Sequence, residues 1–169
     1  MGPLKNISVL EFSGLGPGPY CGMLLADMGA NVIRIGRKET EGIENKFDIH
    51  NRSKRSITAD LKNKDTINEV LKLIDQMDVV FEGYRPGVME KLGLGPNVCL
   101  ERNPKLVYGR MTGWGQEGPM SNQAGHDINY ISLSGALNAI GRKESNPIPP
   151  LNLIGDYGGG GMHLSLIHI

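Results

Sequence analysis

The side chains best suited to proton transfer are those of His126 and Asp156. His126 lies just before an apolar stretch that predicts a helix, and Asp127 is a candidate N-cap for that helix. The positive end of a helix dipole disfavours protonated imidazole, and neutral imidazole is a competent general base. Asp156 precedes the glycine run at residues 158–161, after which a second helix is expected. The pair predicts an acid/base site, although each residue alone is also typical of a cap or a packing position.

A glycine-rich turn follows the first apolar segment. Gly14, Gly16 and Gly18 are spaced G-x-G-x-G, whereas a dinucleotide-binding turn has G-x-G-x-x-G. Pro17 and Pro19 lack the backbone N–H groups that would bind a phosphate. The turn alone therefore leaves open a phosphate site and a simple tight turn.

Basic residues follow two of the predicted strands. Arg37 comes after residues 31–35, and Arg85 comes after residues 79–82. Ligands of open parallel sheets bind beyond the carboxyl ends of the strands. Cations near Arg37, where an unphosphorylated ribose would need an acid, disfavour NAD and leave NADP and coenzyme A open.

The elements that must position these residues alternate along the chain. Apolar runs predict strands, and apolar residues at helical spacing predict helices. This alternation predicts an α/β fold, a doubly wound domain with a mostly parallel sheet. The predicted strands are 7–11, 31–35, 79–82 and 106–111, the predicted helices are 20–28, 65–77, 86–92, 99–102 and 128–140, and residues 36–56 are predicted to form a long loop.

The composition argues against several classes of partner. The 18 Lys and Arg residues balance the 18 Asp and Glu residues, so we expect no nucleic-acid partner. No stretch is long and apolar enough to span a bilayer, so we expect no membrane partner. Cys21 and Cys99 fit no metal or disulfide pattern, and no metal site is expected. The short charge run of Arg52, Lys54 and Arg55 is more typical of a solvated face.

Several segments together resemble a known family. The chain is similar to the α-methylacyl-CoA racemases of the family III CoA-transferase superfamily across nearly all of residues 1–162. The segment from His126 to Tyr130 is the most discriminating part of this resemblance. The segments that carry it are 11–20, 59–62, 82–88, 92–96, 111–116, 124–130 and 150–153.

The resemblance implies both a site and an assembly. It implies that His126 and Asp156 are the catalytic acid/base pair, and that coenzyme A enters as part of the substrate with no prosthetic group. The residues implied to contact coenzyme A are Arg37, Ala59, Leu61, Lys62, Arg85, Asp127 and Tyr130. Residues 1–163 would form the N-terminal part of the large CoA-binding domain, truncated before the small domain. The full-length protein would be an interlocked homodimer, and this length alone is expected to be impaired.

The implied reaction is racemisation of 2-methylacyl-CoA thioesters through an enolate. His126 would remove the α-proton from one face, and protonated Asp156 would return a proton to the other face. For this role the pKa of Asp156 must be raised by burial or by a nearby carboxylate. Backbone N–H groups would stabilise the enolate oxygen.

Two alternatives remain open at this point. The first is a CoA-transferase in which Asp156 is the nucleophile, and the second is a non-catalytic module that binds coenzyme A or NADP. The compartment would be cytoplasmic for a bacterial protein and peroxisomal or mitochondrial for a eukaryotic one. Residues 164–169 match the translation of a sequencing adapter, so they are expected to be a non-native tail.

Overall fold

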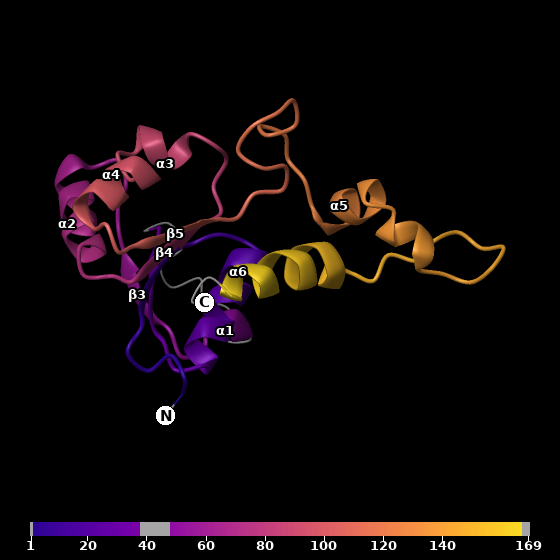
Figure 1. Ribbon diagram of the computed structural model, residues 1–169, viewed down its shortest axis with the longest axis horizontal. Coiled ribbons are helices and arrows are strands. Elements are labelled where there is room, and N and C mark those ends of the chain that lie inside the picture. The colour runs from indigo at the N-terminus through magenta and orange to yellow at the C-terminus, as the bar shows by residue number, and fades with distance from the viewer. Residues whose placement is uncertain (1, 38–47, 167–169) are drawn as a thin grey trace.

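A sheet of parallel strands forms the centre of the molecule in a computed structural model that describes residues 2–37 and 48–166 (Figure 1). The five strands lie in the order β3-β2-β1-β4-β5, and all four pairings are parallel. The prediction of an α/β fold with a mostly parallel sheet is confirmed. The strands are β1 (Ser8–Phe12), β2 (Asn31–Gly36), β3 (Arg55–Thr58), β4 (Val79–Glu82) and β5 (Val107–Arg110).

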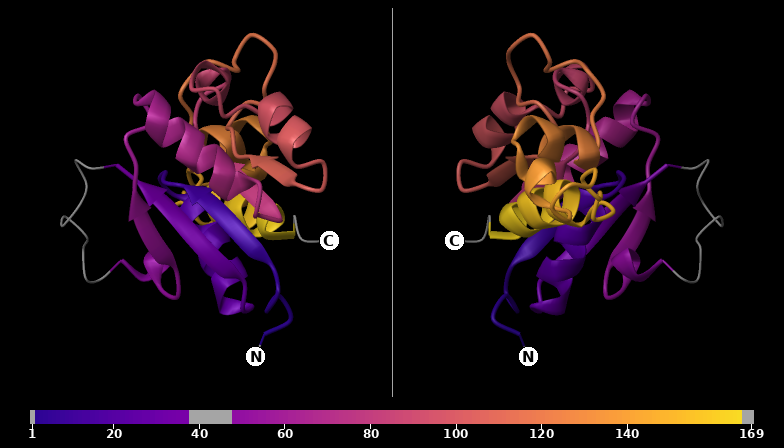
Figure 2. Two further views of the ribbon diagram at one scale, coloured as in Figure 1. Left: turned by 90° about the vertical axis from the view of Figure 1, so that its left-hand side faces the viewer. Right: turned by 90° about the vertical axis from the view of Figure 1, so that its right-hand side faces the viewer.

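Helices cover both faces of the sheet (Figure 2). Alternate strand residues point to opposite faces, so that Leu10 packs on one side of β1 and Val9 on the other. The helices α2 (Lys64–Ile74), α3 (Val88–Lys91) and α4 (Pro96–Arg102) pack on the Leu10 face. The helix α1 (Pro17–Asp27) packs on the Val9 face. This three-layer arrangement is the doubly wound fold expected from the alternation of elements.

The strand order reverses at β1. The chain passes from β1 to β2 and β3 on one side, and then returns to place β4 and β5 on the other side. In doubly wound folds, ligands bind at the carboxyl ends of the two strands that flank such a switch point. The topology therefore directs attention to the segments that follow β1 and β4.

The prediction of a long loop over residues 36–56 is wrong at its end, because residues 55 and 56 begin the strand β3. Its four residues are all exposed, so the sequence gives no apolar signal for it. It pairs with β2 in a register that joins Gly36 to Thr58, and the N–H of Ala59 donates to the carbonyl of Gly36 at 3.1 Å. Residues 38–47 of the predicted loop lie outside the described residues.

The last third of the chain differs from prediction in its helix boundaries. The predicted helix 128–140 is α5 (Asp127–Leu133) followed by a short helix, η3 (Ala136–Ala139). The two are separated by Gly135, which has a φ of 81°. The expected helix after the glycine run begins earlier, because the π-helix η4 (Leu153–Met162) contains that run and continues into α6 (His163–Ser165). In Figure 1, α5 and η3 project away from the sheet.

The glycine run allows η4 to lie directly against α1. A Cβ atom on Gly161 would lie 2.7 Å from the carbonyl oxygen of Pro17 and 2.7 Å from Cδ1 of Tyr20. A Cβ atom on Gly160 would lie 3.3 Å from Cβ of Pro17 and 3.4 Å from Sδ of Met111. Close helix packing, rather than phosphate binding, explains these glycines.

Cys21 and Cys99 are both buried free thiols, as their sequence context predicts. Within residues 2–37 and 48–166, no helix has the length and apolar character needed to cross a membrane. The same residues contain no cluster of three or more His, Cys, Asp or Glu side chains that could hold a metal ion. The predicted tail at residues 164–169 is described only as far as residue 166.

Candidate active site

The carboxyl edge of the sheet gathers most of the segments that the sequence singled out. The glycine-rich turn follows β1, Arg37 follows β2, and residues 59–62 follow β3. Residues 83–85 follow β4, and residues 111–116 follow β5. All five strands are parallel, so their carboxyl ends share one edge of the sheet. Segments more than ninety residues apart in sequence therefore face the same side of the domain.

One group of predicted residues follows β2, β3 and β4 along this edge. Arg37, Lys62 and Arg85 are exposed there. Ala59 and Leu61 are half-buried, and both pack against the core on the α2 side of the sheet. The cations project to solvent beside an apolar floor, an arrangement that suits a ligand with phosphates and a hydrophobic portion.

Arg37 contacts the strand-end turn that contains Arg85. Burial raises the pKa of the Tyr84 hydroxyl, while the charge of Arg37 and a hydrogen bond from it act in the opposite direction. Tyr84 packs partly against the core and immediately precedes Arg85. The turns after β2 and β4 are thus linked across the end of β1.

Glu82 is a buried residue of this edge that the sequence analysis did not select. Its Oε2 accepts a hydrogen bond from the backbone N–H of Tyr84 at 2.6 Å. Its Oε1 lies 3.7 Å from Nε of Arg110 on β5. Burial raises the pKa of Glu82, with the Tyr84 N–H and Arg110 opposing the shift. A glutamate that ends an otherwise apolar strand was the available signal that this side chain holds the turn.

A second group lies where α5 meets η4. The N-cap of α5 is His126, and the backbone N–H of His126 donates to Oδ1 of Asn129 at 2.9 Å. Asp127 is therefore the first residue of α5, and its predicted role as N-cap is wrong. Asp127 is only 3% exposed, and its Oδ2 accepts the backbone N–H of Asp156 at 2.8 Å. The two predicted proton-transfer residues are thus joined through Asp127.

Asp156 lies inside η4 rather than at its start. The N-cap of η4 is Asn152, so the alternative in which Asp156 caps a helix is wrong. Asp156 is half-buried, and a Cβ atom on Gly16 would lie 3.7 Å from its Oδ2. Gly16 has a φ of 63°, a conformation that glycine adopts without strain. The glycine-rich turn therefore faces the carboxyl group of Asp156.

The environment of Asp156 favours its protonated form. Burial raises the pKa of this carboxyl, and the charge of Asp127 raises it further. The charge of His126 acts in the opposite direction and is the smallest of the three effects. The direction of this shift agrees with the raised pKa predicted for Asp156, and burial is its largest cause.

Tyr130 joins α5 to the segment after β5. Its ring lies edge-on to Trp114, with centroids 5.0 Å apart and an interplanar angle of 73°. A Cβ atom on Gly113 would lie 2.3 Å from the Tyr130 hydroxyl, and one on Gly125 would lie 2.7 Å from its Cε1. These glycines make room for the tyrosine ring, which brings the second group to the carboxyl edge.

The charge run before β3 contains a buried ion pair, which corrects the expectation of a solvated face. Nζ of Lys54 lies 2.6 Å from Oε2 of Glu11 on β1 and donates to the carbonyl of Pro19 at 2.9 Å. The side chains of Lys54 and Glu11 are 1% and 0% exposed. Arg52, by contrast, pairs with Asp27 at the surface. Lys54 thus ties the segment before β3 to β1 and to the first turn of α1.

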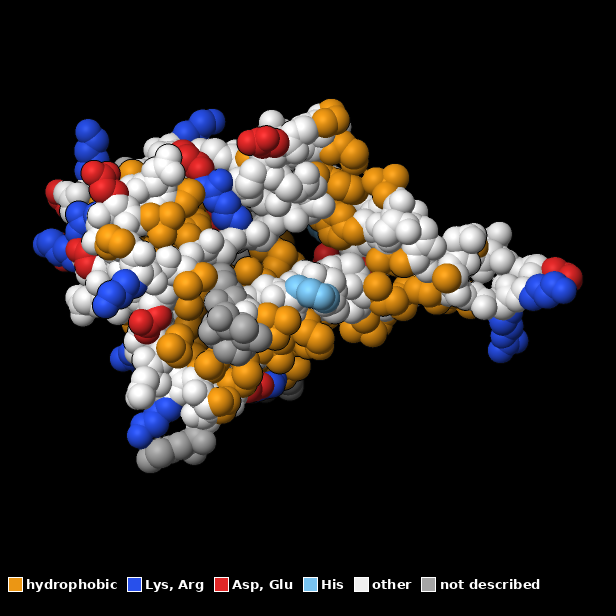
Figure 3. Space-filling view, viewed as in Figure 1, with side chains coloured by type: hydrophobic (Ala, Val, Ile, Leu, Met, Phe, Trp, Pro, Cys, Tyr) orange, Lys and Arg blue, Asp and Glu red, His pale blue; other side chains and the backbone are white. Residues whose placement is uncertain are grey.

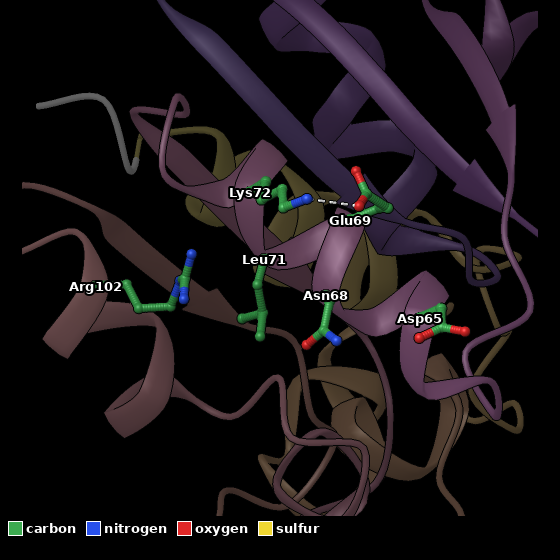
Figure 4. A pocket seen from close by; sticks show the side chains of 6 residues that line it. All are labelled: Asp65, Asn68, Glu69, Leu71, Lys72 and Arg102. Atoms are coloured by element: carbon green, nitrogen blue, oxygen red, sulfur yellow. Dashed lines mark hydrogen bonds and ion pairs between the residues drawn. The ribbon is translucent and has the colours of Figure 1, made fainter.

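A groove between α2 and α4 contains none of the predicted site residues (Figure 4). Three of its charged side chains form ion pairs. Glu69 binds Lys72 at 2.7 Å, and Nε of Arg102 donates to Asp75 at 2.9 Å. The residues that line the groove are Asp65, Asn68, Glu69, Leu71, Lys72 and Arg102. We therefore place the candidate site at the carboxyl edge of the sheet and at the junction of α5 with η4.

Comparison with known proteins gives one family and consistent relatives. The model of CoA-transferase family III matches residues 4–167. The chain is 50% identical to an α-methylacyl-CoA racemase of Mus musculus over 163 residues, which are 96% of this chain and 42% of that protein. It is 47% identical to the Homo sapiens α-methylacyl-CoA racemase, again over 96% of this chain and 42% of the relative. A succinate–glutarate CoA-transferase of Agrobacterium fabrum is 34% identical over 86% of this chain and 41% of its own length.

Solved structures agree with the fold. A CAIB/BAIF family protein from Brucella suis superposes with a TM-score of 0.85 at 28% identity and covers 99% of this chain and 49% of its own. The protein Rv3272 of Mycobacterium tuberculosis superposes with a TM-score of 0.84 at 35% identity, over 98% of this chain and 48% of its own. The chain spans less than half the length of each of these relatives.

Proposed function

The chain belongs to CoA-transferase family III, and we propose that the protein containing it racemises 2-methylacyl-CoA thioesters by exchange of the α-proton. The observation that carries this proposal is the junction of α5 and η4. There the buried carboxylate of Asp127 accepts the backbone N–H of a half-buried Asp156 whose pKa is raised, and His126 immediately precedes Asp127 as the N-cap of α5. A general base and a protonated acid on separate helices can act on opposite faces of one carbon atom. The similarity to proteins named racemases supports the same assignment.

In the proposed reaction, His126 removes the α-proton from one face of the thioester. The electrons of that C–H bond form an enolate, and the carboxyl proton of Asp156 is then transferred to the opposite face of the α-carbon. The roles reverse for the other enantiomer, with ionised Asp156 as base and protonated His126 as acid. A raised pKa of the Asp156 carboxyl group narrows the difference in acidity between the two partners, which suits a reaction that runs in both directions.

We propose that the carboxyl edge of the sheet binds coenzyme A. Arg37, Lys62 and Arg85 would contact phosphate groups, because exposed cations pair well with them. Ala59 and Leu61 would contact the pantetheine chain through their half-buried apolar surface. Asp127 and Tyr130 would meet the thioester end, where α5 approaches the edge. The substrate carries coenzyme A itself, so the proposal needs no prosthetic group.

A CoA-transferase is the second candidate, and the names of several relatives favour it. In that reaction the carboxylate of Asp156 attacks the thioester carbonyl, forms a mixed anhydride and releases the CoA thiolate. A second carboxylic acid is then needed to complete the transfer. Burial and the charge of Asp127 act against the ionised carboxylate that this attack needs. A module that binds coenzyme A without turnover is the third candidate.

We also propose that the complete protein is a homodimer. Several apolar side chains of α5 and η4 are exposed, among them Leu133 at 69% and Leu153 at 54%. Figure 3 shows hydrophobic side chains gathered along this part of the molecule. Apolar surface of this kind is typical of surface that another chain or segment covers. Light scattering on the complete gene product tests the proposal, and a monomeric mass would refute it.

Deuterium wash-in from D₂O into a 2-methylacyl-CoA tests the racemase. The assay uses the complete gene product with no second carboxylic acid, and mass spectrometry detects the label. We expect exchange by the wild type and its loss, with at least one enantiomer, in His126→Ala and Asp156→Asn. Equal rates in His126→Ala and the wild type with both enantiomers would refute the role of His126. No exchange, together with CoA transfer and a hydroxylamine-trapped intermediate once a free acid is added, would establish the transferase instead.

A further inference from the structure

We propose that Asp127 is the positioning residue of Asp156: its buried carboxylate fixes the backbone of η4 at Asp156 and places a negative charge beside the neighbouring carboxyl group. The inference rests on the proposed function, because it assigns to Asp127 the task of preparing the acid of the reaction. It goes beyond a contact with coenzyme A, since it concerns what Asp127 does before any substrate binds.

The geometry of the junction gives Asp127 a specific hold on η4. Oδ2 of Asp127 accepts the N–H of Asp156 at 2.8 Å. Gly155 allows this approach, because a Cβ atom there would lie 3.1 Å from Cα and 3.1 Å from the carbonyl oxygen of Asp127. The same atom would lie 3.2 Å from Cγ of Asp127. The backbone of η4 thus touches the first residue of α5 immediately before Asp156.

The charge of Asp127 is only partly neutralised. The residue is 3% exposed, and its Oδ1 is a buried oxygen with no hydrogen-bond partner within the described ranges. A carboxylate needs several donors to offset the loss of water, and one N–H supplies only part of that. The remaining negative charge acts on the carboxyl group of Asp156 and on the Tyr130 hydroxyl. Two carboxyl groups that share a site cannot both ionise readily, so one keeps its proton.

Three effects act on the pKa of Asp156, and the two larger ones raise it. Burial and Asp127 raise its pKa, and His126 lowers it by a smaller amount. Tyr130, also on α5, has a raised pKa caused by burial and by the charges of Asp156 and Asp127, which places it in the same electrostatic field. On the α1 side, Asp156 faces the uncharged Gly16. Asp127 is therefore the group whose removal most directly changes the protonation of Asp156.

The test is a titration of Asp156 in the complete gene product. The protein is labelled with [4-¹³C]aspartate, and the carboxyl resonances are followed by NMR as pH changes. Asp156→Asn and Asp127→Asn assign the two signals. Asp127→Asn also removes the charge while its amide oxygen can still accept the N–H of Asp156. Asp75→Asn is the matched control, because Asp75 ends α2 and pairs with Arg102.

We expect the midpoint of Asp156 to fall by about one pH unit in Asp127→Asn. The midpoint should not move in Asp75→Asn. The rate of α-proton exchange should decline at alkaline pH, measured with the enantiomer that His126 deprotonates. The pH of this decline should be lower in Asp127→Asn by the same amount. If Asp127 had only a structural role, Asp127→Asn would lower the exchange rate without changing the pH of this decline. An unchanged midpoint in Asp127→Asn would overturn the proposal.

A second measurement uses the titration curves of the wild type, once the two carboxyl signals have been assigned. In the wild type, coupled carboxyl groups should each show the titration step of the other. Two independent curves, with Asp156 at its ordinary value, would overturn the proposal. The outcome also separates this inference from the proposed function. A lowered Asp156 midpoint in Asp127→Asn, with no exchange by the wild type, would retain the positioning role and refute the racemase. Exchange by the wild type with an unchanged midpoint would refute only the positioning role.

Discussion

Removal of Lys54 should expose how strongly the buried ion pair ties β1 to the segment before β3. The Lys54→Met substitution keeps much of the side-chain volume but removes the charge. Glu11 would remain in a site where its side chain is 0% exposed, and its Oε1 already has no hydrogen-bond partner within the described residues. Breaking one side of a buried pair costs roughly 3–5 kcal/mol of unfolding free energy. With a typical urea dependence of ~2 kcal/mol per molar, the unfolding midpoint should fall by about 2 M.

The same reasoning predicts a pH dependence. Burial raises the pKa of Glu11, and Lys54 opposes that shift. Without Lys54, the folded-state pKa of Glu11 should rise further above its unfolded value. A carboxyl group of this kind contributes stability that is present at low pH and is lost as pH rises through the folded pKa. The penalty of Lys54→Met should therefore be larger at pH 8 than at pH 5. Glu11→Gln should behave in the opposite way, because burial lowers the pKa of an unpaired Lys54.

Urea unfolding of the two single variants and the double variant forms a thermodynamic cycle. We expect the double variant Glu11→Gln with Lys54→Met to unfold within about 1 kcal/mol of the wild type, because a neutral pair has no stranded charge. The single variants should be far less stable than the double variant. Additive effects, or a cost of Lys54→Met below about 1 kcal/mol at pH 8, would refute the reasoning.

Further predictions concern the packing of the site. Gly161→Ala should lower the melting temperature by several degrees, since its Cβ atom would lie 2.7 Å from the carbonyl oxygen of Pro17, and thermal unfolding measures this. Gly113→Ala should displace Tyr130, because the Tyr130 hydroxyl would lie 2.3 Å from the new Cβ atom. The expected result is a raised KM for acyl-CoA in steady-state kinetics. Arg85→Ala should weaken binding of coenzyme A several-fold in calorimetry without changing the melting temperature, because the side chain is exposed. An unchanged melting temperature in Gly161→Ala, an unchanged KM in Gly113→Ala or an unchanged affinity for coenzyme A in Arg85→Ala would contradict the corresponding prediction.

The sheet was largely predictable because most of its strands are apolar. β1 and β4 are largely buried on both faces, and most of their residues are apolar. β3 was not predictable in this way, because Arg55-Ser56-Ile57-Thr58 is an exposed edge strand. Only its pairing with β2 defines it, and a pairing is not visible in a local window of sequence. Without β3, the position of Ala59 and Leu61 at the carboxyl edge had no structural explanation.

The helix boundaries of the site were harder to predict than the helices themselves. Gly135, in a left-handed conformation, divides a stretch whose apolar spacing suggested one helix. The glycine run looked like a turn before a helix, whereas it lies inside η4 and permits contact with α1. Glycine propensity favoured a turn, but the packing of η4 on α1 determines the outcome. Asp156 consequently lies on a helix face, and not at a helix start.

Three buried carboxylates explain why the site needed the structure. Glu11 binds Lys54, which in turn donates to the first turn of α1. Glu82 accepts a hydrogen bond from the backbone N–H of Tyr84, and Asp127 accepts one from the backbone N–H of Asp156 on η4.

A buried charge costs stability, and apolar packing alone would fill the same space at least as well. These carboxylates add geometric specificity. A hydrogen bond fixes the position of one atom relative to another, whereas apolar contacts allow the two surfaces to shift. Glu11 and its partner are 43 residues apart, and Asp127 and its partner are 29 residues apart. Local sequence patterns therefore predict His126 and Asp156 as proton-transfer groups, whereas the backbone of Asp156 is held by Asp127, a partner distant in sequence. Substitutions at Glu82 and Asp127 should accordingly alter the geometry of the carboxyl edge, whereas a substitution at Glu11 should also cost stability because it strands the buried charge of Lys54.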